Sequence, residues 1–122
     1  MQLDHRRIAV TGGFGALGAA TVHAALGAGA RVVAIDRTAP PAGGLGAATC
    51  LGGVDLADPQ AAKEALATAA RSMGGRDALV NIAGTFRYET RAGGNLDTGD
   101  LLYRVNLRTA VAASQAALEH LQ

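Results

Sequence analysis

The sequence predicts an α/β fold in which helices cover both faces of a parallel sheet. Four short apolar runs alternate with longer segments whose apolar residues recur at helical spacing. The runs lack the polar alternation of a half-exposed strand, and continuously apolar runs are typical of strands that are buried on both faces. Glycine clusters separate most of the runs from the helical segments. This order predicts a right-handed, doubly wound parallel sheet.

Length and composition limit the class of protein. With 122 residues, 49% apolar and 17% charged, the chain suits one domain, residues 1–122, and is too short for two. A net charge of +1 gives no electrostatic reason to expect nucleic acid or an anionic membrane as a partner. No run approaches the ~20 apolar residues of a membrane-spanning helix. The single cysteine, Cys50, excludes an intrachain disulfide, so we expect a cytoplasmic domain.

The first half of the chain predicts a strand, a helix and a second strand. Arg7–Thr11 is apolar with two β-branched residues and stops at a glycine cluster, Gly12–Gly18, which predicts a turn. Apolar residues at helical spacing predict a helix over Ala19–Ala28, which glycines then end. Arg31–Asp36, with four apolar residues in a row, predicts the second strand.

The middle of the chain predicts a loop, a weak strand, a helix and a fourth strand. Residues 38–46 contain two prolines and three glycines and predict a loop. Cys50–Val54 is a weaker third strand because two glycines interrupt it. Asp58 and Pro59 are well suited to open a helix that runs to Met73. Asp77–Ile82 predicts the fourth strand.

The end of the chain predicts a long helix after an irregular segment. Thr85–Asn95 is polar and irregular. Leu96–Gln122 has mostly helical character, and an asparagine inside a helix is unfavourable by propensity. We therefore expect a bend near Asn106, or a functional reason for that residue.

The glycine cluster after the first strand predicts a phosphate-binding loop. Gly13, Gly15 and Gly18 satisfy the pattern G-x-G-x-x-G between a strand and a helix. Glycines let the backbone turn tightly and approach a pyrophosphate, which rests on the N-terminus of the helix. The candidate cofactor-binding residues of this loop are Thr11, Gly12, Gly13, Phe14, Gly15, Ala16, Leu17 and Gly18.

An acidic residue after the second strand supports a dinucleotide as the ligand. Asp36 follows Gly18 by 18 positions, close to the ~20 expected for a carboxylate that binds the adenosine ribose. A carboxylate accepts hydrogen bonds from both ribose hydroxyls and repels a 2′-phosphate, which favours NAD. Arg37 keeps NADP open as an alternative. A P-loop is disfavoured because Ala19 follows Gly18 where a lysine is required.

Five segments together resemble the short-chain dehydrogenase/reductase family. The glycine loop is similar to the family's T-G-x-x-x-G-x-G, with Ala16 in place of the middle glycine. Asp36 follows the second strand as it does in the family. The other three segments are Val54-Asp55-Leu56, Asn81-Ile82-Ala83-Gly84 and Val105-Asn106-Leu107, and all five occur in the family's order.

The resemblance implies a role for each segment. Asp55 and Leu56 correspond to the segment whose Asp contacts the adenine ring, although Asp55 could instead serve the turn before the next helix. Asn81, Ala83 and Gly84 correspond to the family's N-N-A-G beside the cofactor, in which the asparagine has a structural role. Asn106 corresponds to a member of the catalytic tetrad.

The same resemblance implies that part of the catalytic machinery lies outside this sequence. The family uses Tyr-x-x-x-Lys and an upstream Ser, and here the only lysine is Lys63, which no tyrosine precedes by four positions. Family members are about twice this length, as a sheet of two mononucleotide-binding halves requires. The chain thus looks like the first half of an NAD(P)-dependent oxidoreductase acting on a small-molecule hydroxyl or carbonyl substrate. The alternative is a non-catalytic dinucleotide-binding module or sensor.

The family's architecture also predicts how the chain associates. It implies an incomplete Rossmann-type sheet with strand order 3-2-1-4, in which Asp77–Ile82 forms an edge. An apolar edge strand has unpaired N–H and C=O groups that invite pairing. We therefore expect a homo-oligomer, or association with the missing C-terminal half.

Overall fold

The computed structural model describes residues 2–84, 96–118, 120 and 121. Four strands form one parallel sheet in the order β3-β2-β1-β4, so the predicted order 3-2-1-4 is confirmed. In the centre of the sheet, each residue of β1 from Ile8 to Thr11 has a partner in both neighbouring strands. The strands are β1 Arg7–Thr11, β2 Arg31–Ile35, β3 Thr49–Leu51 and β4 Ala78–Asn81.

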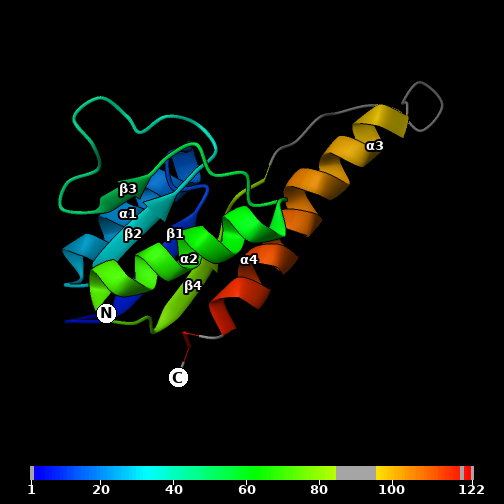
Figure 1. Cartoon of the computed structure of the whole chain (residues 1–122). Coiled ribbons are helices and arrows are strands. Elements are labelled where there is room, and N and C mark those ends of the chain that lie inside the picture. The colour runs from blue at the N-terminus through cyan, green and yellow to red at the C-terminus, as the bar shows by residue number, and fades with distance from the viewer. Residues whose placement is uncertain (1, 85–95, 119, 122) are drawn as a thin grey trace.

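Helices cover both faces of the sheet, as the continuously apolar strands predict (Figure 1). Helix α1, Ala16–Gly27, packs on one face through Val22 and Ala25. Helices α2, Pro59–Met73, and α4, Thr109–Leu118, share the other face and contact each other. Small residues allow this close packing: the residues of α4 that join the core are Ala112, Ala113 and Ala117.

Several element boundaries differ from the sequence-based expectation, and β2 and β4 are shorter than predicted by one and two residues. Helix α1 begins at Ala16, three residues earlier than predicted, so the end of the glycine loop is already helical. Strand β3 is shorter than predicted because Gly53 adopts a left-handed backbone, φ +71°, and its N–H donates to Thr38 O at 3.2 Å. The Asp58 cap and the Pro59 start of α2 are as predicted, with Asp58 Oδ1 accepting from Gln60 N at 3.1 Å.

The last helical region has three parts. Helix α3, Leu96–Leu102, leads into a π-helical turn, η1, Tyr103–Arg108, and then into α4. The irregularity expected near Asn106 is therefore this π-helical turn. Such turns are rare and are frequent at functional sites. The irregular segment predicted over 85–95 lies outside the described residues.

Strand β4 is the last strand of the sheet in the described part of the chain. Leu121 makes an isolated parallel bridge with Arg76, just before β4. Across the described ranges, no helix has both the length and the apolar character that a bilayer crossing needs.

Candidate cofactor-binding site

A cavity of about 740 Å³ opens at the carboxyl ends of the strands. Its walls come from the segments that follow β1, β2, β3 and β4, together with part of α3, the π-helical turn and the start of α4. In open parallel sheets, ligands bind outside the carboxyl ends of the strands, where the strand order reverses. Here β1 lies between β2 and β4, so the order reverses next to the glycine loop.

The glycine loop closes tightly at the start of α1. Gly12 has a left-handed backbone, φ +67°, and a Cβ there would lie 2.6 Å from Ala83 N. A Cβ on Gly18 would overlap the carbonyl oxygen of Gly12, so the first helical turn meets the loop this closely only because residue 18 is a glycine. Gly13 is tightly packed against Ala34 and does not line the cavity.

Gly15 has a different place in the loop. It is the N-cap of α1, has no side-chain cap, and a Cβ on it would meet nothing nearer than Gly12 O at 3.7 Å. The first N–H groups of a helix have no acceptor within the helix. The residues that carry them, Ala16, Leu17 and Gly18, line the cavity, and this end of a helix favours an anion.

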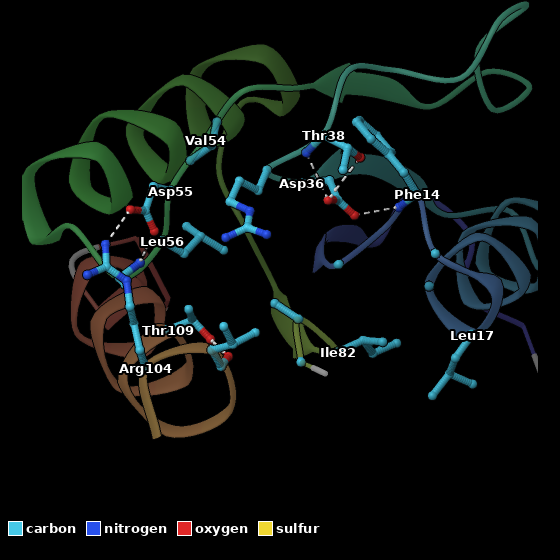
Figure 2. Close-up of a pocket in the computed structure, with 18 of the residues that line it drawn as sticks. Phe14, Leu17, Asp36, Thr38, Val54, Asp55, Leu56, Ile82, Arg104 and Thr109 are labelled. Atoms are coloured by element: carbon cyan, nitrogen blue, oxygen red, sulfur yellow. Dashed lines mark hydrogen bonds and ion pairs between the residues drawn. The ribbon is translucent and has the colours of Figure 1, made fainter. Parts of the chain in front are cut away.

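Asp36 stands beside the glycine loop, as the sequence predicts. Its Oδ2 accepts from the backbone N–H of Phe14 at 3.1 Å (Figure 2). Its Oδ1 accepts from both the N–H and the hydroxyl of Thr38, each at 3.2 Å. Asp36, Arg37 and Thr38 all line the cavity. The carboxylate is half-buried, so it supports the loop and still borders the cavity.

The opposite wall carries a second acidic residue. Asp55 Oδ1 accepts from Ala57 N at 3.0 Å, and its Oδ2 forms an ion pair with Arg104 at 2.9 Å (Figure 2). The bond from Ala57 and the charges of Arg104 and Arg37 lower the pKa of Asp55 below its usual range. The turn role that the sequence left open for Asp55 is thus present, and Asp55 and Leu56 also line the cavity.

Thr11 connects the loops that follow β1 and β4. It is fully buried, and its Oγ1 lies within 3.2 Å of Ile82 N and 3.3 Å of Ala83 N, both of which donate to it. Thr11 itself does not line the cavity, whereas Ala83 and Gly84 do. Its side chain therefore places the end of β4 against the glycine loop.

The two asparagines of the predicted site lie just outside the cavity wall. Asn81 is exposed, and its Nδ2 donates to Ser114 Oγ on α4 at 3.1 Å, which is a structural contact between strand and helix. Asn106 is next to a lining residue, since a Cβ on Gly84 would come 2.8 Å from Asn106 Oδ1. The predicted roles of Asn81 and Asn106 toward a ligand stay predictions.

Sequence reasoning missed three polar residues of the cavity wall, Thr38, Arg104 and Thr109. Thr38 could have been found, because an Asp followed two residues later by Thr is typical turn chemistry. Arg104 gave no such signal: it reaches Asp55 only because the π-helical turn lies beside the loop after β3. The described residues contain no group of three or more His, Cys, Asp or Glu side chains able to hold a metal ion.

The comparison with protein families agrees with this geometry. The model of the short chain dehydrogenase family matches residues 6–122. The chain belongs to the short-chain dehydrogenase family. Its four-stranded sheet and flanking helices correspond to the N-terminal part of the family's Rossmann fold.

Individual relatives support the same assignment. The L-xylulose reductase of Mesocricetus auratus is 37% identical over 117 residues, covering 93% of this chain and 46% of the reductase. The crystal structure of a Burkholderia cenocepacia short chain dehydrogenase in complex with NADP is 32% identical with a TM-score of 0.82, covering 99% of this chain and 53% of that one. A Serratia marcescens short-chain dehydrogenase/reductase is 31% identical with a TM-score of 0.83, covering 100% and 55%. The chain thus spans about half the length of these family members.

Proposed function

We propose that this chain is the cofactor-binding half of an NAD(P)-dependent oxidoreductase that interconverts a hydroxyl and a carbonyl group on a small molecule. The observation that supports it most is the 3.1 Å hydrogen bond between Phe14 N and Asp36 Oδ2. This bond holds the Asp36 carboxylate beside the glycine loop at one cavity, which supports a helix end that binds phosphate and a carboxylate that binds ribose. Family membership supports the reaction class.

The residues of the cavity fit a dinucleotide. The tight contact of Gly12 with Gly18 leaves the N-terminus of α1 open, where the free N–H groups would hold the diphosphate. Asp36 would accept hydrogen bonds from the adenosine ribose, and Asp55 would contact the adenine. When bound, the nicotinamide ring would supply or accept the hydride. Asn106, beside Gly84, would be the one tetrad member present in this chain.

The hydrogen bonds of Asp36 refine the proposal for the ribose. A carboxylate offers about four acceptor positions, and Phe14 and Thr38 already use three of them. Two ribose hydroxyls therefore require one of these donors to move. The Thr38 hydroxyl is the donor that can rotate away most easily, because the other two are backbone N–H groups.

The charges favour NAD over NADP. The Asp36 carboxylate would repel a 2′-phosphate, whereas the exposed Arg37 beside it would attract one. The charge of Arg37 also helps to lower the pKa of Asp55 across the cavity. The NADP complex of the Burkholderia relative keeps NADP as the second candidate.

A non-catalytic dinucleotide-binding module or sensor is the alternative function. It requires only the dinucleotide site that the cavity offers, and no Tyr-x-x-x-Lys pair. Either function requires the same dinucleotide site. They differ in the reaction: the presence of Ser and Tyr-x-x-x-Lys in a partner polypeptide or in a longer form of this protein would support the oxidoreductase.

Titration with reduced nicotinamide cofactors, followed by nicotinamide fluorescence, tests the proposal. We expect this chain to bind NADH and to prefer it over NADPH by about tenfold or more, because the carboxylate repels the 2′-phosphate. Adding alcohols or ketones should give no turnover.

The Asp36→Ala variant should narrow the gap in affinity between NADH and NADPH. Glu64→Ala, which removes an exposed carboxylate of α2 outside the cavity, is the matched control and should leave the gap unchanged. Unchanged selectivity in Asp36→Ala would exclude Asp36 as the discriminating residue. Failure of the unmodified chain to bind either cofactor would contradict the proposed function itself.

A further inference from the structure

Two arginines attach the π-helical turn to the loop between β3 and α2. Arg104 donates from Nη2 to Asp55 Oδ2 at 2.9 Å, and Arg108 donates from Nε to Ala57 O at 2.8 Å. Both acceptors belong to residues 55–57, which line the cavity. The turn is therefore fixed at two points to one short loop.

That loop is itself held in one shape. Asp55 uses Oδ1 for the N–H of Ala57 and Oδ2 for Arg104, so each oxygen has a separate partner. Asp58, next along the chain, caps α2. Leu56 and Ala57 are buried. The arginines thus contact a segment that is anchored in the core and in a helix.

Asn106 lies between the two attached arginines and beside Gly84 at the cavity. A π-helical turn contains more residues than an α-helical one, so its register depends on what holds its ends. The following helix α4 is fixed by Ala112 and Ala113 in the core. If the turn relaxed to α-helical form, the residues before it would rotate by as much as about 100°, and Asn106 would move relative to Gly84.

We propose that Arg104 and Arg108 are positioning residues, which hold the π-helical turn on residues 55–57 and thereby set the place of Asn106 beside Gly84. The role is geometric, because Arg104 and Asp55 have side chains that are 59% and 42% exposed and such pairs add little stability. The functional meaning of this role rests on the proposed function. A ligand that contacts Asp55 would then change the surroundings of Asn106 through Arg104.

The first test uses the free protein. In ¹⁵N-labelled chain, the side-chain amide peak of Asn106 is assigned by its loss in Asn106→Asp. In the double variant Arg104→Gln/Arg108→Gln we expect this peak to shift and amide hydrogen exchange within 103–108 to accelerate about tenfold, because an ion pair and a hydrogen bond are lost. Arg71→Gln, an exposed arginine of α2 that contacts Thr68, is the matched control and should change neither.

The second test adds ADP, which carries the adenine and diphosphate but no nicotinamide. ADP should shift the Asn106 side-chain peak in the unmodified chain. In the double variant that shift should fall by at least half, while the peaks of residues 12–18 still respond to ADP. The variant Arg104→Lys keeps a positive charge opposite Asp55. Its Asn106 peak should therefore shift with ADP by more than that of the double variant.

The outcomes separate this inference from the proposed function. If ADP leaves residues 12–18 of the unmodified chain unchanged, the proposed function fails, and the free-protein test still decides the positioning role. If the Asn106 peak and the exchange rates of 103–108 are the same in the double variant as in the unmodified chain, the positioning role is wrong. Thermal midpoints within about 5 °C of each other will show that the variants are folded.

Discussion

Gly18 approaches the carbonyl oxygen of Gly12 closely because it carries no Cβ. Gly18 belongs to the first turn of α1, and a Cβ there would overlap Gly12 O. The glycine pattern in this chain therefore has a packing reason that is independent of any ligand. Gly15 lacks such a reason, because its Cβ would meet only Gly12 O at 3.7 Å, which is an ordinary contact.

These two positions should respond differently to alanine. Gly18→Ala forces the loop and helix apart, and we expect a loss of about 2 kcal/mol or more in the free energy of unfolding. Gly15→Ala should change it by less than about 1 kcal/mol, because a weaker N-cap is offset by a less flexible unfolded chain. Urea denaturation measures both. A Gly15→Ala chain of normal stability that binds NADH poorly would support close approach of a phosphate to Gly15, and equal losses in the two variants would contradict this account of the loop.

Arg76 is a buried charge with too few partners. It is 1% exposed, its Nη2 donates to Leu66 O, and its Nε and Nη1 have no partner among the described residues. Burial lowers the pKa of Arg76. Buried polar groups without hydrogen bonds cost about 1–3 kcal/mol, so this residue destabilises the fold as the structure shows it.

Replacing Arg76 by Met should therefore stabilise the chain by about 1–3 kcal/mol, because Met fills similar space without a charge. A higher urea midpoint with an unchanged slope would show it. Arg31→Met is the control, because Arg31 is exposed and we expect a change within about 0.5 kcal/mol. A destabilised Arg76→Met chain would mean that the guanidinium has a partner in solution.

At the scale of residues, the sequence predicts those contacts of the site that depend on local sequence patterns. The glycine loop and Asp36 come together as predicted because each directly follows one of two adjacent parallel strands, β1 and β2. The contact of Arg104 with Asp55 joins residues 49 positions apart and depends on a π-helical turn. No local pattern encodes that turn except the unfavourable asparagine, so Arg104 could not be found in the sequence.

Strands β1 and β4 are joined at their beginnings by an ion pair. Arg7 donates from Nε and Nη2 to Asp77 Oδ2 and Oδ1, each at 3.1 Å, and its backbone N–H donates to Oδ2 at 2.9 Å. Arg7 also donates from Nη1 to Gly74 O at 2.6 Å, at the end of α2. These bonds lower the pKa of Asp77 to about 2.

The lowered pKa predicts a pH dependence of stability. The pKa of Asp77 is about 2 in the folded chain and about 3.9 in an unfolded one. A carboxylate of this kind stabilises the fold above the unfolded pKa, and its contribution is lost as pH falls from about 4 to 2. The difference in thermal midpoint between the unmodified chain and Asp77→Asn should therefore shrink over that range. Arg7→Gln should lose the same pH-dependent part of the stability. A difference in thermal midpoint that stays constant from pH 6 to pH 2 would contradict the lowered pKa of Asp77.

At the scale of elements, strand β1 and the start of α2 are where the sequence predicts them, because their signals are local. β1 is bounded by a glycine turn, and α2 begins with an Asp cap and a proline. The sequence predicts the start of α1 three residues too late because a glycine inside a helix is unfavourable by propensity. Gly18 nevertheless lies in the first turn of α1, where its missing Cβ lets the helix approach Gly12 O. β3 ends early for a tertiary reason, the bond from Gly53 N to Thr38 O.

At the scale of the whole molecule, β4 has one strand neighbour, β1, in the described part of the chain. The residues of β4 from Ala78 to Val80 are apolar and half-buried. An open apolar strand edge promotes pairing with another chain. We therefore propose that the isolated chain self-associates, or binds a C-terminal half of the proposed oxidoreductase, along this edge.

Sedimentation velocity over a hundredfold range of concentration tests the association. We expect dimers or larger species that increase with concentration, because the association buries the free N–H and C=O groups of β4. A polypeptide that carries the missing half should compete with self-association. A monodisperse monomer of ordinary stability at every concentration would contradict association through the edge of β4.

The most direct measurement of the central claim is an NMR titration of the ¹⁵N-labelled chain with NADH. If the N-terminus of α1 holds the diphosphate and Asp36 holds the adenosine ribose, the backbone amides of residues 12–18 and of Asp36 will shift together and saturate at one NADH per chain. Shifts confined to other surfaces, such as the cavity lined by Arg6 and Arg31 at the opposite ends of the strands, would contradict the claim, as would no shift at all.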